Sequence, residues 1–129
     1  MFPNRINKLI DQAIELAKTN PAKFRLACIA SNKRGQVISS GINSKHTHPV
    51  QAKLAIRKGH KDQIGLHSEI ATIVKARKPI HFLIIVRLLH NDELSMAKPC
   101  AICREAIRLA EIKTIIYSTD TGFVLEKLR

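Results

Sequence analysis

The chain has no tryptophan, one tyrosine and four phenylalanines among its 129 residues. Such a low aromatic content argues against an extensive platform for stacking nucleobases. Cysteine is also scarce. Its three residues form no disulfide framework, and without a visible secretion signal they are better explained as a metal site. The longest apolar run, Phe82 to Val86, is too short to span a membrane. We therefore expect a cytoplasmic protein with no membrane partner.

Acidic residues are scarce as well. The sequence has 10 Asp and Glu against 22 Lys and Arg, which gives a formal charge of +12 and a pI near 10.1. Such a surface attracts polyanions, so nucleic acid is an expected partner; the alternative is a basic surface with no specific ligand. With 45% hydrophobic residues, a chain of this length can bury a core without disulfides. We expect a single domain over residues 1–129.

Periodicity and turn signals divide the first half of the chain into two regions. An ordered region is followed by a basic segment, broken by proline and glycine, that leads into the histidine discussed below. A long irregular stretch of this kind is usually functional, although residues 51–58 could form a short helix. The predicted elements are a helix over 4–19 with Asn4 as N-cap, strands over 24–31 and 36–42, and the irregular segment over 43–66.

The second half alternates between helices and strands. The predicted elements are a helix over 67–77, a central strand over 81–89, a loop over 91–98, a helix over 100–110, a strand over 114–118 and a last strand or helical tail over 123–128. This order predicts an α/β fold with three α/β/α layers and a mixed, mainly five-stranded sheet. The link over 119–122 is too short for a crossover helix, so a last strand would pair antiparallel with 114–118.

Two short motifs carry the chemistry. His67 and Glu69 lie two residues apart, and Cys100 and Cys103 lie three apart. One histidine and two cysteines can bind Zn²⁺ and leave its fourth position open to water. A helix start places Cys100 and Cys103 on one face, where the amide dipoles favour thiolates. His67 and Glu69 can reach the same metal only over the start of their own helix, so we expect two parallel helix starts to face each other.

Neither motif is specific when it stands alone. A Cys-x-x-Cys pair can be a redox pair or half of a structural zinc site. A structural site would need a fourth ligand, for which His46, His48, His60 or Cys28 could be proposed. Cys28 alternates within an apolar strand and is more simply a core residue. Order, spacing and strand–helix context together favour the catalytic site.

His67-Ser68-Glu69 followed by Pro99-Cys100-Ala101-Ile102-Cys103 resembles the signature of the cytidine deaminase superfamily. The resemblance implies Zn²⁺ as cofactor at His67, Cys100 and Cys103, with Glu69 as proton shuttle. Ser68 replaces the usual alanine, which leaves the chemistry intact. The resemblance further implies that Asn43 contacts the substrate and that main-chain atoms near Ser68 and Pro99 read the base edge. The short link before the last strand is similar to free cytidine deaminases and bacterial toxin DNA deaminases.

Charge then suggests the substrate. The first hypothesis is deamination of cytosine in DNA, with single strands easier to use because the base must leave the stack; RNA stays open as the other polynucleotide. The basic residues Lys45, Lys53, Arg57, Lys58 and Lys61 would contact phosphates; the alternative is that they are ordinary solvated side chains. His46 and His48 would border the pocket or contact a phosphate, unless they belong to the loop surface.

Two alternatives stay open. One is a deaminase of free cytidine, deoxycytidine or their monophosphates, and the other is a non-catalytic, zinc-stabilised module that binds nucleic acid. The segments 94–98 and 117–121 should rim the pocket, with Tyr117 either stacking on a flanking base or lying in the core. The oligomeric state is left open by the sequence.

Overall fold

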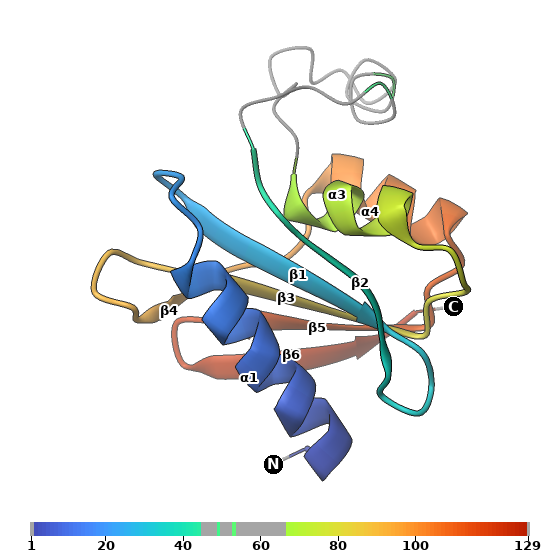
Figure 1. The fold of residues 1–129 in the computed structure, drawn as a ribbon, viewed down its shortest axis with the longest axis horizontal. Coiled ribbons are helices and arrows are strands. Elements are labelled where there is room, and N and C mark those ends of the chain that lie inside the picture. Colours follow the sequence, from blue (N-terminus) through green and yellow to red (C-terminus); the bar gives the residue numbers. More distant parts are fainter. Residues whose placement is uncertain (1, 45–48, 50–52, 54–66, 129) are drawn as a thin grey trace.

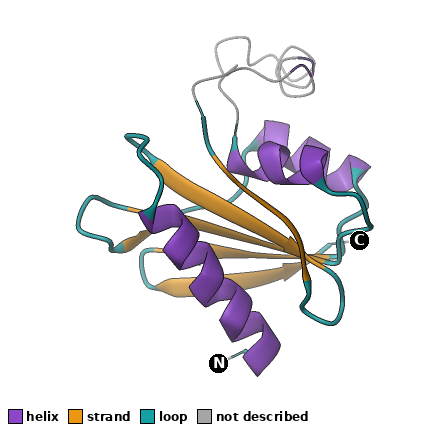
Figure 2. Ribbon diagram, in the orientation of Figure 1, coloured by secondary structure: helices purple, strands orange, loops and turns teal. Residues whose placement is uncertain are grey.

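A computed structural model describes residues 2–44, 49, 53 and 67–128. In this part of the chain, a twisted mixed sheet is covered by helix α1 on one face and by helices α3 and α4 on the other (Figures 1 and 2). The elements are α1 (Asn4–Lys18), β1 (Arg25–Ser31), β2 (Val37–Ile42), α3 (Ser68–Lys75), β3 (Phe82–Leu88), β4 (Leu94–Ser95), α4 (Ala101–Leu109), β5 (Thr114–Thr119) and β6 (Gly122–Lys127). The predicted three-layer α/β architecture is confirmed.

The sheet runs in the order β2-β1-β3-β5-β6, and the two-residue strand β4 pairs with the end of β3. β1 is antiparallel to both β2 and β3, whereas β3 and β5 are parallel. β6 pairs antiparallel with β5 after a tight turn, as the short link predicted. β1 and β3 are inner strands, and the beginning of β1 therefore lies beside the end of β3 at one end of the sheet, where Leu26 pairs with Arg87.

Helix α1 forms its layer because its apolar residues recur at three- and four-residue spacing and make one buried face. Ile6, Leu9, Ile10 and Ala13 pack against side chains of β1 and β3. The helix begins at Asn4, with Pro3 as N-cap, so the prediction that Asn4 itself is the cap was wrong. Proline lacks the N–H that the first turn cannot pair in any case.

The other face of the sheet is covered by α3 and α4. Ile70 of α3 packs against Ile102, Cys103 and Ala106 of α4, so the two helices share a buried seam. Gly41 of β2 allows α3 to approach the sheet closely: a Cβ there would lie 2.9 Å from both Ala71 Cβ and Thr72 Oγ1. The seam fixes the helix starts relative to each other.

Helix α3 is shorter than the predicted 67–77, because the chain turns extended at Ala76. The predicted loop over 91–98 contains β4, whose two residues add a short sixth strand to the five expected. None of the described helices is long and apolar enough to cross a bilayer.

Candidate metal centre

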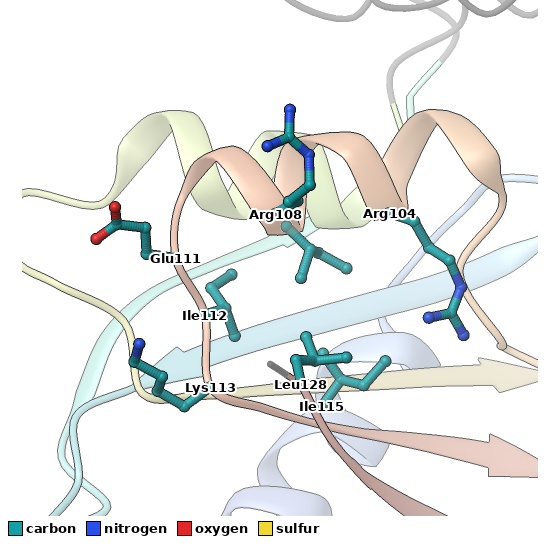
Figure 3. A pocket seen from close by; sticks show the side chains of 8 residues that line it. Arg104, Arg108, Glu111, Ile112, Lys113, Ile115 and Leu128 are labelled. Atoms are coloured by element: carbon teal, nitrogen blue, oxygen red, sulfur yellow. The ribbon is translucent and has the colours of Figure 1, made fainter.

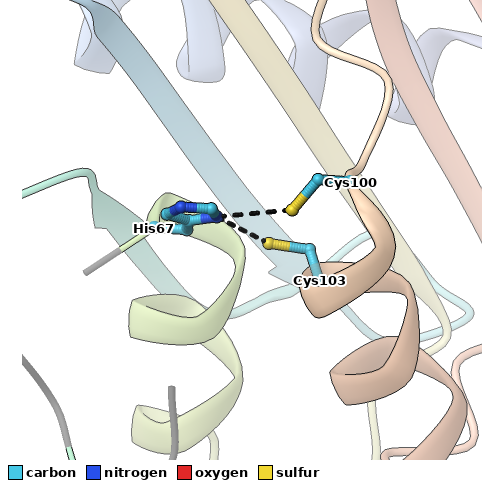
Figure 4. Close-up of side chains that lie close together, drawn as sticks. All are labelled: His67, Cys100 and Cys103. Carbon is cyan, nitrogen blue, oxygen red and sulfur yellow. Dashed lines mark hydrogen bonds between the residues drawn. The ribbon is translucent and has the colours of Figure 1, made fainter. Parts of the chain in front are cut away.

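His67 and Cys100 are the N-cap residues of α3 and α4, and Cys103 lies in the first turn of α4. The two helix starts face each other, so the three side chains converge from different segments (Figure 4). His67 Nδ1 lies 3.2 Å from Cys103 Sγ and 3.6 Å from Cys100 Sγ. One ligand atom from each residue fits within 4.8 Å of the other two. The predicted facing of the helix starts is confirmed.

The sulfur atoms form a coupled pair. The pKa of Cys100 is lowered to about 3, mainly because it is hydrogen-bonded to Cys103 and also because His67 is nearby. The same contact, together with burial, raises the pKa of Cys103. The hydrogen bond with Cys100 also raises the pKa of His67, against the effect of burial. The cluster therefore already favours a negative sulfur beside the imidazole.

This donor set suits zinc. Imidazole nitrogen and thiolate sulfur are preferred zinc ligands, and three protein ligands leave one tetrahedral position for a reactant. Cys28 is not in the cluster; it is fully buried in the sheet, and burial raises the pKa of its thiol, as expected of a core residue. Of the fourth ligands proposed for a structural site, Cys28 does not join the three, and His46, His48 and His60 lie outside the described residues.

Glu69 lies beside the ligands in the first turn of α3 and is buried, with only 4% of its surface exposed. Its Oε1 accepts a hydrogen bond of 2.8 Å from Ser68 Oγ, which is itself fully buried. Thr72 Oγ1 donates to the Ser68 carbonyl oxygen one turn away at 2.8 Å. Ser68 therefore has a side-chain contact that the expected alanine could not make.

Two of the three metal-binding residues, His67 and Cys100, line a cavity of about 200 Å³. Its wall combines residues from both helix starts, one end of the sheet and the β4–α4 connection. The lining residues are Leu26, His67, Ser68, Glu69, Arg87, Met96, Ala97, Lys98 and Cys100. Of the two segments predicted to rim the pocket, 94–98 contributes residues 96–98 to the lining, whereas 117–121 contributes none, so that part of the prediction was wrong.

Arg87 lines the cavity although no sequence motif predicted it there. It interrupts the apolar run of β3, and its position pairs with Leu26 on one side and Ser95 on the other. Side chains alternate along a strand, so Arg87 lies on the same face as buried Leu83 and Ile85. A charged residue at an inward position of a central strand was the signal that could have revealed it.

Asn43 is held by a fixed hydrogen-bond network. Its Oδ1 accepts from Asn20 Nδ2 at 2.6 Å and from the Leu26 amide at 3.1 Å. Asn20 is buried; its Nδ2 also donates to the Leu26 carbonyl oxygen, and its Oδ1 accepts from the Ala22 amide. Asn43 does not line the cavity itself but adjoins it through Leu26. Asn20, which follows the C-cap of α1, thus links this helix to the site.

Other predicted residues lie apart from the cavity or outside the described residues. Pro99 is buried next to Cys100 without lining the cavity. Tyr117 is 7% exposed and packs in the core, which favours that interpretation over base stacking. Lys53 is exposed. The predicted contacts that fall outside the described residues are Lys45, His48, Arg57, Lys58 and Lys61.

A larger cavity of about 450 Å³ is lined by residues of α4, of the α4–β5 connection and of β5, together with Leu128 (Figure 3). Its two arginines are already paired: Arg104 makes a two-pronged contact with Glu126 at 3.0 and 3.1 Å, and Arg108 pairs with Glu105. The cavity contains none of the metal-binding residues and no cysteine or histidine. Size alone therefore does not identify the reactive site.

Comparison with known proteins supports the interpretation of His67, Cys100 and Cys103 as a zinc site. The sequence matches the cytidine and deoxycytidylate deaminase zinc-binding region over residues 3–119, and the chain belongs to this family. No curated protein matches the sequence.

Solved structures share the fold. The dCMP deaminase of the cyanophage S-TIM5 in apo form has a TM-score of 0.62 at 18% identity, covering 91% of this chain and 84% of that one. The cytidine deaminase of Mycobacterium leprae has a TM-score of 0.61 at 16% identity, with 96% and 94% covered. A family defined by a zinc-binding region is consistent with His67, Cys100 and Cys103 as the residues that would bind zinc.

Proposed function

We propose that the protein is a zinc-dependent hydrolytic deaminase that converts cytosine to uracil with release of ammonia, acting on DNA. The observation that carries the deaminase proposal is the convergence of His67, Cys100 and Cys103 within 4.8 Å, with a buried glutamate, Glu69, that lines the same cavity as His67 and Cys100. This arrangement has what hydrolysis of an aromatic amine needs: an open metal position and a proton carrier.

The cofactor would supply a water made acidic enough to give hydroxide near neutral pH. Each protein group has a distinct task around it. Glu69 would take one proton from the attacking water on one carboxylate oxygen and deliver it to N3 of the base. It would then take the second proton from the new hydroxyl group on C4 and deliver it to the departing amino group. Ser68 Oγ holds the other oxygen of Glu69 at 2.8 Å, which fixes the carboxylate for both transfers. Cytosine and water thereby give uracil and ammonia.

DNA as substrate is supported by the charge of +12 and by the two cations in the cavity wall, Arg87 and Lys98. The proposal also includes the phosphate contacts predicted in the 43–66 segment, of which Lys53 is exposed. Single strands should be better substrates than duplexes, because unstacking the target base costs free energy. Asn43 and the main chain around Ser68 and Pro99 would hold the nucleotide.

The second candidate is deamination of free (d)CMP, cytidine or deoxycytidine. It is favoured by the similar fold of the S-TIM5 dCMP deaminase, whose structure has also been solved in complex with dCMP and dUMP at 17% identity and a TM-score of 0.62. A cavity of about 200 Å³ is small, and one nucleotide would occupy it.

One assay separates the candidates. Zinc-loaded protein is given cytidine, dCMP, single-stranded DNA, duplex DNA and RNA, and uracil is counted by mass spectrometry. Uracil in DNA that disappears with Glu69→Ala would support the proposal, and uracil from monomers alone would select the second candidate. A non-catalytic zinc module predicts no uracil from any substrate and binding of nucleic acid that Glu69→Ala leaves unchanged.

A further inference from the structure

Arg87 occupies a position where a strand normally carries an apolar core residue. Ile85 and Leu83, two and four residues earlier on the same face of β3, are fully buried under α3 and α4. Arg87 continues this row beyond the helix starts and lines the cavity that contains His67 and Glu69. The sheet therefore places a cation on the floor of the site.

The guanidinium has no acidic partner among the residues that the structure describes. The ion pairs of this part of the chain use Lys18, Arg25, Arg104 and Arg108, and Arg87 is in none of them. A half-buried cation without an anion is costly, because desolvation is not offset. An anionic ligand in the cavity would supply the missing partner.

The arginine is also held in place. Its guanidinium carbon lies over the Phe24 ring, 5.2 Å from the ring centroid, which is within cation–π distance. Its backbone N–H donates to Ser118 Oγ at 3.0 Å, and Ser118 Oγ donates to the Ser95 carbonyl oxygen at 2.7 Å. Within the described part of the chain the guanidinium makes no hydrogen bond or ion pair of its own, so its N–H groups can bind two phosphate oxygens.

A second cation lies in the same wall. Lys98 is exposed and lines the cavity two residues before Cys100. The preceding residue, Ala97, donates its amide to the Ser118 carbonyl oxygen at 2.9 Å. Ser118 therefore holds both the strand that carries Arg87 and the connection that carries Lys98.

We propose that Arg87 and Lys98 form a phosphate-binding site in the wall of the zinc cavity, so that the substrate is a cytosine nucleotide, free or within a strand, rather than a nucleoside. This inference rests on the proposed deamination of cytosine in the same cavity. It adds a specificity determinant that the metal-binding motifs do not contain.

Binding to a protein that cannot turn over provides the test. In the Glu69→Ala background, zinc-loaded protein is titrated with dUMP, with deoxyuridine and with a DNA trinucleotide that has deoxyuridine at its centre, followed by NMR. Arg87→Ala should weaken dUMP or trinucleotide binding about 10- to 100-fold, as expected for loss of charge-assisted hydrogen bonds, and leave deoxyuridine binding unchanged. Lys98→Ala should weaken binding of the same ligand by a smaller factor.

Arg34→Ala is the matched control, because it removes the same charge from the exposed β1–β2 turn at the other end of the sheet. Arg87→Lys keeps the charge without the two-pronged edge, and thermal melting checks that each variant is folded. Weaker dUMP binding identifies a free monophosphate as the source of the phosphate, and an effect on the trinucleotide alone identifies DNA; either supports the site.

Equal weakening of deoxyuridine and both phosphate ligands, or no change in any, would overturn it. So would binding of neither phosphate ligand to the Glu69→Ala protein. Failure of the proposed function looks different. If Arg87→Ala selectively weakens binding of the phosphate ligands but the wild-type protein makes no uracil, the phosphate site is supported and the proposed deamination is wrong. If Arg87→Ala leaves binding unchanged but the wild-type protein makes uracil, the deamination is supported and the phosphate site is wrong.

Discussion

The amide of Asn20 decides which end of Asn43 is free to meet a ligand. Asn20 Oδ1 accepts from the Ala22 amide, so its Nδ2 must face the Leu26 carbonyl oxygen and Asn43. Asn43 Oδ1 is then taken by two donors, which leaves its NH₂ group as the part that a substrate can reach. We infer that Asn43 recognises an acceptor, such as a sugar hydroxyl or phosphate oxygen.

Asn20→Asp tests this orientation. An added oxygen would face Leu26 O and Asn43 Oδ1, both acceptors, so we expect a loss of about 1–3 kcal/mol in the free energy of unfolding. The KM should rise while bound zinc stays at one per chain, since no metal ligand is touched. Asn7→Asp removes an amide donor from α1, away from the site, and should leave KM unchanged. An unchanged KM in Asn20→Asp would remove Asn43 from substrate binding.

Ser68 and Glu69 allow a second test at this scale. Ser68→Ala should lower kcat, because one carboxylate oxygen loses its donor at 2.8 Å, and leave KM and zinc content nearly unchanged. Glu69→Gln should lower kcat about 100- to 10,000-fold, as expected for a general acid–base group. Steady-state kinetics and metal analysis give both numbers. A Ser68→Ala enzyme with unchanged kcat would show that the hydrogen bond has no role in proton transfer.

Helix α3 depends on its close approach to β2. Adding a methyl group at Gly41 places carbon 2.9 Å from Ala71 Cβ and Thr72 Oγ1, so the helix must move. Gly41→Ala should cost about 1–3 kcal/mol of unfolding free energy, and weaken zinc binding because α3 carries His67. Ser40→Ala, on the opposite face of the strand, is the control. Thermal melting and zinc titration measure both effects, and an unaltered zinc affinity would show that the helix start tolerates the shift.

Helix α4 is tied to β6 by the contact between Arg104 and Glu126. Arg104 lowers the pKa of Glu126 below its usual value near 4.5. A lowered pKa in the folded state means that the pair stabilises the protein above about pH 4.5 and that this stability is lost as pH falls through the folded pKa. Because both side chains are about one third exposed, the contribution should be at most about 1 kcal/mol.

Denaturant unfolding between pH 3 and 7 checks the sign. Glu126→Gln should be less stable than wild type at pH 7, and the difference should shrink below pH 4.5. A difference that grows in acid would contradict the assignment.

Charge acts at the scale of the whole molecule. If the +12 surface binds DNA, the logarithm of the association constant should fall with the logarithm of salt concentration, with a slope near −0.7 per phosphate neutralised on single strands. Binding of a single-stranded oligonucleotide to Glu69→Ala protein at several salt concentrations gives that slope. A slope of about −0.7, as for a single phosphate contact, would mean that most of the positive charge takes no part in DNA binding.

How far the sequence predicts this molecule depends on the range of the interactions. The helices, the strands and the cluster of His67, Cys100 and Cys103 follow from local periodicity and spacing, since helix starts orient their own first residues. Arg87 and Asn20 could not be placed in the same way. Their roles arise from strand register and from contacts across the fold, which a linear pattern does not contain. β4 was missed because two residues are too few to show a period.

Catalysis by a single bound zinc is tested most sharply by the rate of uracil formation as zinc is returned to metal-free protein, with whichever substrate is turned over fastest. We expect the rate to rise in proportion to bound zinc and to stop rising at one zinc per chain, while Glu69→Gln binds the same single zinc and stays nearly inactive. Uracil formation without metal, or full activity in zinc-loaded Glu69→Gln, would contradict the proposed role of the cluster and its glutamate.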